Sequence, residues 1–552
     1  MTPESIPSFA THVVTNQPAS LSPYDAWQTD IALQQAIHRE GAGWAVDRLA
    51  AYGSIVGSEM VELGFAANEN KPRFRPYDPY GHRIDEVEFH PAYHRLMALG
   101  IAHGVSGFAW RHADTAGAHV ARAGLMYLHG QPDQGTCCPL TMTYASVAAL
   151  RHRPGLADAW MPRITSVHYD SRPIPAWEKR GNTIGMGMTE KQGGSDVRAN
   201  TTRAERMGSA SEATYSLVGH KWFLSAPMCD AFLVLAQTDF GPGGLTCFLV
   251  PRFAPDGAKN RVHLQRLKDK LGDWSNASAE VEFEGAFGWR IGDEGRGIAT
   301  ILEMVALTRQ DCMIGSAAIM RQALVQAIHH ARGRRAFGRL LIDQPLMRSV
   351  LADLALESEA AMLFSLRVAR SVDASHRDPA EAAFARVATA IGKYWVCKRG
   401  PPFVNEAQEC LGGAGYVEES ILPRLYRQAP LNSIWEGSGN IQCLDVLRSL
   451  SREPSTRDAL YTEFATVRGR DARLDRHIVA IEDMLRNPLD EARSRTIVEA
   501  LALALQATLM LGVVEAPAVG EAFCAARLGP DVARCYGTID EAFVATLIDR
   551  AF

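Results

Sequence analysis

The spacing of hydrophobic positions changes twice along this chain. From Asp30 to about Ala159 the apolar residues recur with a helical period, as in the run 93–109. From about 181 to 290 the period shortens to two, for example in 279–283, and turn residues at 241–244 and 255–257 separate the short runs. Helical spacing returns at Gly297 and continues to Leu450. The pattern therefore predicts a mainly α protein with a central antiparallel β domain.

The same pattern predicts five parts. Residues 1–28, rich in Pro, Ser and Thr, form an extended arm; 29–180 form an N-terminal helical domain; 181–290 form the middle β domain. Residues 291–450 form a C-terminal four-helix bundle, with breaks expected at Gly333, Pro345 and Pro401-Pro402. Residues 451–552 form an additional helical domain.

Composition and charge narrow the class of protein. The 552 residues are 47% hydrophobic with a net charge of −5, which indicates a globular protein and does not favour nucleic-acid binding or a basic membrane anchor. The N-terminus lacks the pattern of a signal peptide, and the apolar run 500–514, interrupted by Gln506, reads as a buried or interface helix. We expect no membrane association.

The residues that could ligate metals or form disulfides do not form a recognisable framework. Ten cysteines are scattered without a C-x-x-C pair, which favours a reducing, cytoplasmic location. His90 and His94 are spaced i, i+4, but no third ligand is close in sequence, so no metal site is predicted.

The additional domain contains 12 arginines, no lysine and 16 acidic residues. A stripe that contacts the phosphates of double-stranded DNA could be formed by Arg468, Arg470, Arg473 and Arg476. Asp471 and Asp475 are interleaved with them, which favours the plainer interpretation of a solvated, salt-bridged helix face. Both interpretations stay open.

The stretch 431–442 carries one carboxyl group, Glu436, between Trp435 and Gly437. An aromatic neighbour that excludes water raises the pKa of a carboxyl group and suits it to act as a base. The same run is also typical of a helix start with Ser438 as N-cap.

Three further stretches carry candidate chemistry, each with a plainer explanation. Residues 185–196 could present backbone N–H groups and hydroxyls to a flat heteroaromatic ring or a phosphate, or form a β-turn. Four arginines within 332–339 suit a pyrophosphate or a helix C-terminus. Residues 411–416 form a glycine-rich turn between helices.

Taken in order, these stretches resemble the acyl-CoA dehydrogenase family. The residues that carry the resemblance are Met188-Thr189-Glu190 with Gly194-Ser195-Asp196, Arg334 with Phe337-Gly338, Gly412-Gly413-Ala414-Gly415-Tyr416, and Arg427 with Trp435-Glu436-Gly437-Ser438. The chain is most similar to the AidB-type flavoproteins of the adaptive response to DNA alkylation. That likeness includes Asn16-Gln17-Pro18, 268–272, 275–278, 397–400, 432–440 and the additional domain.

The resemblance implies FAD as cofactor, a homotetramer, and an acyl-CoA thioester whose α-proton is removed by Glu436, with an electron acceptor for turnover. The residues implied to contact FAD are Met188, Thr189, Gly194, Ser195, Phe223, Ser225, Arg334, Phe337, Gly412, Gly413, Ser438 and Asn440. Arg309 and Trp435 are implied to line the substrate pocket.

Three positions depart from the family's pattern. Glu409 replaces a glutamine, which is unfavourable beside a pyrophosphate. Ala306 stands where an acidic residue often contacts CoA, and Trp435 is larger than the usual aromatic. These departures predict weak or restricted dehydrogenation.

Three hypotheses remain. The first is an AidB-type dehydrogenase of restricted activity that also binds DNA. The second is a DNA-associated protein that keeps the flavin domain as a scaffold, which at a net charge of −5 requires a local basic groove. The third is a catabolic acyl-CoA dehydrogenase.

Overall fold

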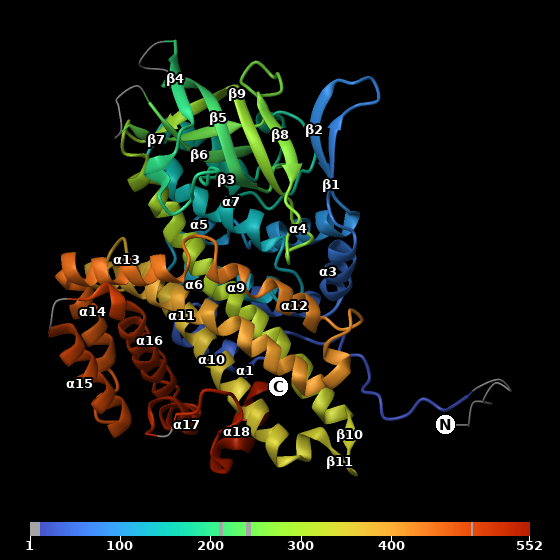
Figure 1. The fold of residues 1–552 in the computed structure, drawn as a ribbon, viewed down its shortest axis with the longest axis vertical. Coiled ribbons are helices and arrows are strands. Elements are labelled where there is room, and N and C mark those ends of the chain that lie inside the picture. The colour runs from blue at the N-terminus through green and yellow to red at the C-terminus, as the bar shows by residue number, and fades with distance from the viewer. Residues whose placement is uncertain (1–10, 209–212, 239–243, 487–488, 531) are drawn as a thin grey trace.

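The computed structural model describes residues 11–208, 213–238, 244–486, 489–530 and 532–552. A β domain lies at one end of the molecule, above a layer of N-terminal helices and a bundle of long helices (Figure 1). The C-terminal helices flank the bundle, and the N-terminal segment projects from the opposite side. Residues 1–10 of the predicted arm lie outside the described residues; the rest of the arm, residues 11–28, contains no helix or strand.

The N-terminal domain is helical as predicted, except for one hairpin. Its helices are α1 (Ile31–Arg39), α2 (Val46–Val56), α3 (Glu59–Glu69), α4 (Pro91–His103), α5 (Phe108–Arg111), α6 (Ala118–His129), α7 (Cys137–Leu150) and α8 (Pro154–Ile164). Strands β1 (Arg73–Tyr77) and β2 (Arg83–Glu88) interrupt them. The helical prediction was wrong there, because residues 73–77 alternate in exposure with the period of two that favours a strand.

The middle domain is one seven-stranded sheet. Its strands are β3 (Ile184–Gly187), β4 (Arg203–Met207), β5 (Thr214–Ser225), β6 (Ala231–Gln237), β7 (Leu245–Pro251), β8 (Val262–Leu267) and β9 (Ser278–Ile291). Most neighbours pair antiparallel, as predicted, but β3 pairs parallel with β6 in the register Met186 to Leu233. Strands β6 and β7 are buried almost throughout, which fits a strand covered on both faces. The predicted turn at 241–243 lies outside the described residues.

The bundle is built on three long helices, α9 (Gly297–Gly333), α10 (Pro345–Ala374) and α11 (Pro379–Leu411), with α12 (Leu422–Gln428) and α13 (Gly439–Arg452) following. The predicted breaks at Gly333 and Pro345 are confirmed. The predicted break at Pro401-Pro402 was wrong, because α11 continues through both prolines. Its packing against α9 and α10 outweighs the local loss of backbone donors.

The additional domain packs on the bundle through α14 (Pro454–Ala465), α15 (Ala472–Arg486), α16 (Ser494–Leu511), α17 (Pro517–Leu528) and α18 (Glu541–Ala551). Buried ion pairs tie it to α10: Arg527 to Glu357 at 3.0 Å and Arg550 to Glu359 at 2.8 Å. Gln506 of α16 accepts a hydrogen bond from Trp395 of α11 at 2.8 Å.

One stretch of the described chain, Glu491–Leu511, is long and apolar enough to cross a membrane. Within the protein, 72% of its most apolar window is buried. The helix therefore packs in the core, as the sequence predicted for 500–514.

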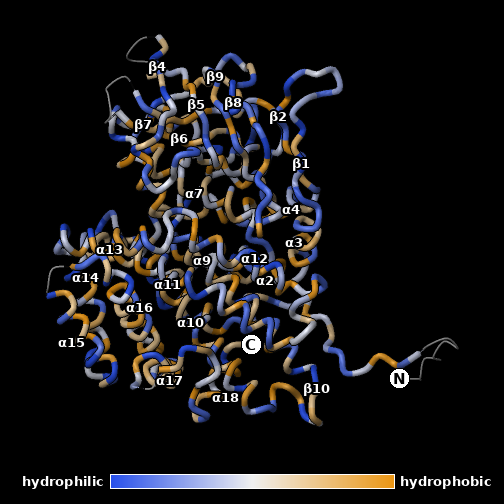
Figure 2. The backbone as a smooth tube through the Cα atoms, in the orientation of Figure 1, coloured by the Kyte–Doolittle hydropathy of each residue, from blue (hydrophilic) through white to orange (hydrophobic). Residues whose placement is uncertain are grey.

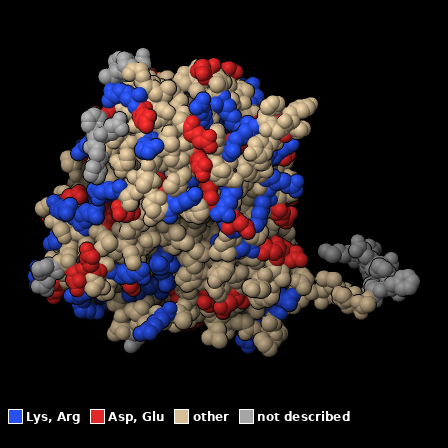
Figure 3. Space-filling model, turned by 45° about the horizontal axis from the view of Figure 1, so that its top comes forward, with Lys and Arg blue, Asp and Glu red and all other residues tan. Residues whose placement is uncertain are grey.

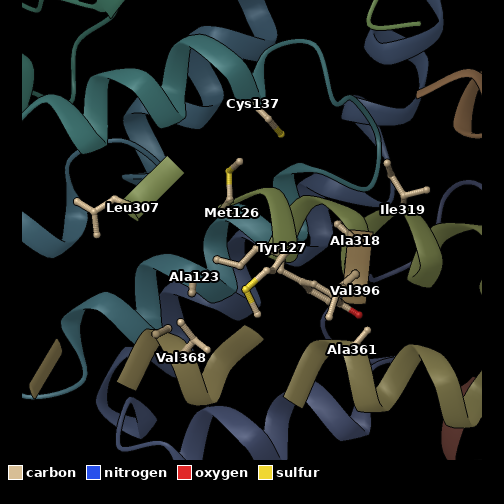
Figure 4. Close-up of a cluster of buried hydrophobic side chains, with 14 of the residues drawn as sticks. Ala123, Met126, Tyr127, Cys137, Leu307, Ala318, Ile319, Ala361, Val368 and Val396 are labelled. Atoms are coloured by element: carbon tan, nitrogen blue, oxygen red, sulfur yellow. The ribbon is translucent and has the colours of Figure 1, made fainter. Parts of the chain in front are cut away.

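A single hydrophobic core runs through the N-terminal helices and the bundle. Figure 4 shows Met126 and Tyr127 of α6 packed among side chains of α9, α10 and α11, including Ile319, Ala361 and Val396. Figure 2 shows hydrophobic residues distributed over all layers, which fits a core that is continuous across the predicted domain boundaries.

Candidate active site

Glu436 lies in the short link between the 3₁₀ turn Leu431–Ser433 and α13. Its backbone is left-handed, with φ of +57°, a conformation that costs a non-glycine residue on the order of 1–3 kcal/mol. The side chains of Lys393 and Arg309 bond the backbone carbonyls of this segment. The Lys393 ammonium donates to the carbonyls of Trp435 and Gly437 at 2.7 and 2.6 Å, and Arg309 Nε donates to the Glu436 carbonyl at 2.9 Å.

The Glu436 carboxyl group receives one hydrogen bond from described residues, from Thr308 Oγ1 to Oε2 at 2.8 Å. Burial raises the pKa of Glu436, and the Thr308 hydrogen bond and the charges of Arg309 and Lys393 only partly oppose this effect. The other carboxylate oxygen makes no hydrogen bond to described residues. Glu436 is therefore an uncommitted carboxyl group with an elevated pKa, which suits a general base.

The two other residues predicted for the substrate pocket are tied down by their neighbours. Trp435 Nε1 donates to Asn432 Oδ1 at 3.1 Å, which fixes the indole beside Glu436. Arg309 pairs with Asp445 at 2.9 Å, so its charge is partly neutralised. Ala306 is exposed one turn earlier on α9.

The second half of the site is the loop that follows β3. Glu190 anchors it, with a fully buried ion pair to Lys221 at 2.7 Å and a hydrogen bond from Thr202 Oγ1 at 2.6 Å. Burial raises the pKa of Glu190, but Lys221 and the hydrogen bonds outweigh burial and bring the pKa to about 2. Burial also lowers the pKa of Lys221, to about 8, against the opposing charge of Glu190.

The anchored loop leaves several groups free. The hydroxyls of Thr189 and Ser195 make no hydrogen bond to described residues, and Phe223 is 44% exposed. Asn200 Nδ2 holds the Met188 carbonyl at 2.9 Å. A Cβ at Gly194 would lie 2.6 Å from Thr189 Oγ1, so any larger residue here would displace the Thr189 side chain.

Cys138 of α7 connects the two halves. Its thiol hydrogen-bonds with Ser225 at the end of β5. Burial raises the pKa of this thiol to about 12; the charge of Lys270 opposes the rise, and the charges of Asp273 and Glu436 add to it. Ser225 thus bonds a thiol whose pKa also responds to the charge of Glu436, so one chain brings its candidate base within electrostatic range of the β-domain edge.

The remaining residues predicted to contact FAD lie elsewhere in the chain. Arg334 and Phe337 belong to the hairpin of β10 (Arg335–Ala336) and β11 (Arg339–Leu340), at the end of the molecule opposite the sheet (Figure 1). Gly412 and Gly413 lie on an exposed 3₁₀ turn after α11, with open space at both Cβ positions. Within one chain, the hairpin that carries Arg334 and Phe337 therefore lies away from the β domain.

Ser438 and Asn440 begin α13. Ser438 occupies the N-cap position that the sequence indicated, but its hydroxyl makes no capping bond. The Asn440 side-chain oxygen accepts two hydrogen bonds from Arg495 of the additional domain, at 3.0 and 2.7 Å.

Sequence reasoning missed Thr308, Lys393, Lys221, Cys138 and Arg495. Thr308 and Lys221 had a local signal, since Thr308 precedes Arg309 and Lys221 lies two residues before Phe223. Lys393, Cys138 and Arg495 had none, because they reach the site through tertiary packing.

Glu409, His90 and His94 each have an ordinary structural partner. Glu409 is exposed and accepts a hydrogen bond from Asn405 at 3.1 Å, one turn back on α11. His90 caps α4, and His94 bonds Tyr169 at 2.9 Å. The described residues contain no group of three or more His, Cys, Asp or Glu able to hold a metal ion.

The arginines of the additional domain do not share one helix face. Arg468 and Arg470 precede α15, and Arg470 donates to the Leu511 carbonyl at 3.1 Å. Arg473 forms an ion pair with Asp471 at 2.6 Å, so the stripe is interrupted. Arg468, Arg470 and Arg476 form no ion pair with described carboxylates.

Three family models match the chain in sequence. The Adaptive response protein AidB N-terminal domain matches residues 16–171, the acyl-CoA dehydrogenase middle domain matches 185–286, and the acyl-CoA dehydrogenase C-terminal domain matches 295–451. The chain belongs to the acyl-CoA dehydrogenase family and is an FAD-dependent oxidoreductase by that membership.

Within the family, the chain is similar to AidB. The protein named Putative acyl-CoA dehydrogenase AidB of Escherichia coli (strain K12) is 49% identical over 94% of each chain. Acyl-CoA dehydrogenase family member 11 of Caenorhabditis elegans is 32% identical over 73% of this chain and 66% of its own. The crystal structure of C. elegans ACDH-11 in complex with C11-CoA superimposes with a TM-score of 0.85, at 26% identity and 95% coverage of both chains.

The β-domain residues fit the flavin part of FAD. A half-exposed phenyl ring at Phe223 offers an apolar face, and the free hydroxyls of Thr189 and Ser195 offer donors and acceptors for a ring edge. Ser225 adds a hydroxyl next to Cys138. The donor set therefore suits a flat heteroaromatic ring with polar edges.

Proposed function

We propose that this protein dehydrogenates an acyl-CoA thioester at its α,β-bond, with Glu436 as the base. The observation that carries the proposal is the Glu436 carboxyl group, whose pKa burial raises and which receives a single hydrogen bond from described residues. The C. elegans relative was solved with C11-CoA, which supports an acyl-CoA as the substrate class.

Each residue near Glu436 has a defined part in this proposal. Glu436 removes the proton from the α-carbon, and FAD, when bound, supplies the acceptor for the hydride from the β-carbon. Thr308 orients the carboxylate, while Lys393 and Arg309 keep its backbone in the left-handed conformation. Trp435 narrows the pocket and excludes water. The product is an α,β-unsaturated thioester, and turnover requires an external electron acceptor.

The cofactor site in this proposal is shared between subunits of a homotetramer. Met188, Thr189, Gly194, Ser195, Phe223 and Ser225 contact the flavin ring. The adenine and pyrophosphate side is contacted by Arg334, Phe337, Gly412, Gly413, Ser438 and Asn440. The separation of the β10–β11 hairpin from the β domain within one chain supports a contribution from a second copy. The proposed compartment is the cytoplasm.

We expect restricted activity, because Ala306 offers no charge to CoA and Trp435 occupies part of the pocket. The test is anaerobic bleaching of the flavin absorbance by straight and branched acyl-CoA thioesters of increasing length. Bleaching confined to a narrow group of substrates supports the proposal. If no acyl-CoA bleaches the flavin, the dehydrogenase function is wrong.

A second candidate function is binding of double-stranded DNA in the response to DNA alkylation. The guanidinium groups of Arg468, Arg470 and Arg476, which form no ion pair with described carboxylates, support it, as does the likeness to AidB. Figure 3 shows lysine and arginine side chains, with acidic side chains among them, at the lower left of that face, on the side where Figure 1 places the additional domain. Binding that weakens steeply with salt, and is reduced by R468E with R470E, supports this function. Binding that is absent or insensitive to salt contradicts it.

A further inference from the structure

The N-terminal segment makes specific bonds to the hairpin that carries Arg334. The Asn16 side chain bonds both backbone groups of Arg335: its Nδ2 donates to the Arg335 carbonyl at 2.9 Å, and its Oδ1 accepts from the Arg335 N–H at 2.7 Å. Arg334 Nη1 donates to the Asn16 carbonyl at 2.6 Å. Asn16 therefore bonds both Arg334 and Arg335, which lie 318 and 319 positions later in the sequence.

The backbone around Asn16 is shaped for this contact. Asn16 has φ of +57°, a left-handed conformation that asparagine tolerates better than most residues. Farther along, His329 Nε2 bonds the Ala19 carbonyl at 2.7 Å. A Cβ at Gly333 would lie 2.8 Å from Pro18, so the arm crosses the end of α9 where only glycine leaves room.

The hairpin needs such support. Strands β10 and β11 have two residues each, and an isolated two-stranded hairpin is marginal in water. Its tip consists of Phe337 and Gly338, both with positive φ, and Phe337 is 99% exposed. Asn16 bonds the free edge of β10 much as a third strand would.

We propose that Asn16 is a positioning residue for the cofactor, holding the hairpin so that Arg334 and Phe337 meet the FAD bound by a second copy of this chain. The proposal rests on the FAD contacts assigned above to Arg334 and Phe337. It gives the N-terminal arm a part in the site, although the arm lies far from Glu436 in the sequence.

The test compares N16G, N16D and the matched control N70A in the full-length holoprotein. Glycine keeps the left-handed backbone and removes both side-chain bonds, whereas aspartate keeps the Oδ1 acceptor and loses the donor. Asn70 is an exposed asparagine at the end of α3 whose side chain, among the described residues, bonds only the Ala66 carbonyl. FAD release on dilution is measured by the rise in flavin fluorescence, and global stability by the melting temperature of the flavin-free protein.

We expect FAD to bind about tenfold more weakly in N16G, about threefold more weakly in N16D, and unchanged in N70A. Hydrogen exchange at residues 334–340 should accelerate in N16G, while the melting temperature of the flavin-free protein stays within about a degree of the wild type. Wild-type FAD affinity in N16G overturns the proposal. So does a loss of affinity that merely follows a fall in the melting temperature.

R334A separates this proposal from the cofactor assignment beneath it. If R334A leaves FAD affinity unchanged, the assigned role of Arg334 is wrong and the Asn16 proposal fails with it. If R334A weakens FAD binding and N16G does not, only the Asn16 proposal fails. If Asn16 acts through Arg334, the double variant N16G/R334A binds FAD about as weakly as R334A alone.

Discussion

Two carboxyl groups define the two halves of the site, and their surroundings are opposite. Glu190 in the β domain faces Lys221 and accepts hydrogen bonds from Thr201, Thr202 and Gln192. Its pKa falls to about 2. Glu436 beside the bundle receives one hydrogen bond from described residues, and burial raises its pKa. Glu190 follows the glycine-containing run 185–189 and Glu436 follows Trp435, so the sequence drew attention to both. Of the two, Glu436 has the fewer partners and can accept a proton from a substrate.

Burial raises the pKa of both carboxyl groups, and the number and charge of their partners decide the net direction of each shift. Glu190 accepts several hydrogen bonds and pairs with a cation, so it stays charged and fixes a loop. Glu436 accepts one hydrogen bond from described residues, so burial increases its proton affinity. The Glu190–Lys221 pair contributes little net stability at neutral pH, because the depressed pKa of Lys221 offsets the gain at Glu190. It anchors Glu190 within the loop that also carries Thr189 and Ser195.

The largest expected effect follows from removing the reactive carboxyl group. E436Q should lower the rate of flavin bleaching by an acyl-CoA by about 10²- to 10⁴-fold, because the amide cannot accept the α-proton. Flavin content should stay at the wild-type level, since Glu436 is not assigned to the cofactor. Stopped-flow absorbance measures the rate, and a variant that bleaches at the wild-type rate would remove Glu436 from the mechanism.

Neutralising Glu190 should lower the stability of the fold rather than the rate of the reaction. E190Q leaves the Lys221 ammonium buried without its counter-charge, so we expect the free energy of unfolding to fall by about 3–5 kcal/mol. Urea denaturation followed by circular dichroism measures it. E205Q, on the exposed face of β4, is the control. An unchanged urea midpoint in E190Q would contradict the assigned role of the pair.

The two carboxyl groups should also differ in acid. The Glu190 pKa is depressed from 4.5 to about 2, so its stabilising effect is complete above pH 4.5 and is lost as pH falls toward 2, by about 3 kcal/mol at most. Glu436 has the opposite sign: its raised pKa means that the folded state loses stability as pH rises through that pKa. Stability measured from pH 2 to 7 in E190Q and E436Q should therefore depart from the wild type in opposite directions.

The smallest expected effect concerns the single hydrogen bond to Glu436. T308V removes the donor that favours the charged form, so the pKa of Glu436 should rise further and the pH–rate profile should move to higher pH. At pH 7 bleaching should slow by about tenfold. T308S, which keeps the hydroxyl, should restore the wild-type profile. An unmoved profile in T308V would show that Thr308 does not set the proton affinity.

Much of this could be predicted from the sequence, because period and motif are local properties. The start of α9 at Gly297 and its end at Gly333 follow directly from the apolar spacing and the glycine. The hairpin at 73–88 and the continuity of α11 through Pro401 were missed, since tertiary packing decides both. In the site, Glu436 could be singled out from its neighbours in the chain. Thr308 and Lys393 could not, because they approach Glu436 from distant helices.

The additional domain packs tightly on the bundle, and this packing limits which variants can distinguish dehydrogenation from DNA binding. The pairs Arg527–Glu357 and Arg550–Glu359, the bond between Gln506 and Trp395, and the bonds from Arg495 to Asn440 all cross this junction. Truncation at residue 451 would expose the apolar partners of α16 and remove the counter-ion of Glu359 on α10. A shortened chain that lost both activities would therefore be uninformative. Genetic dissection of this protein calls for point substitutions on an intact chain.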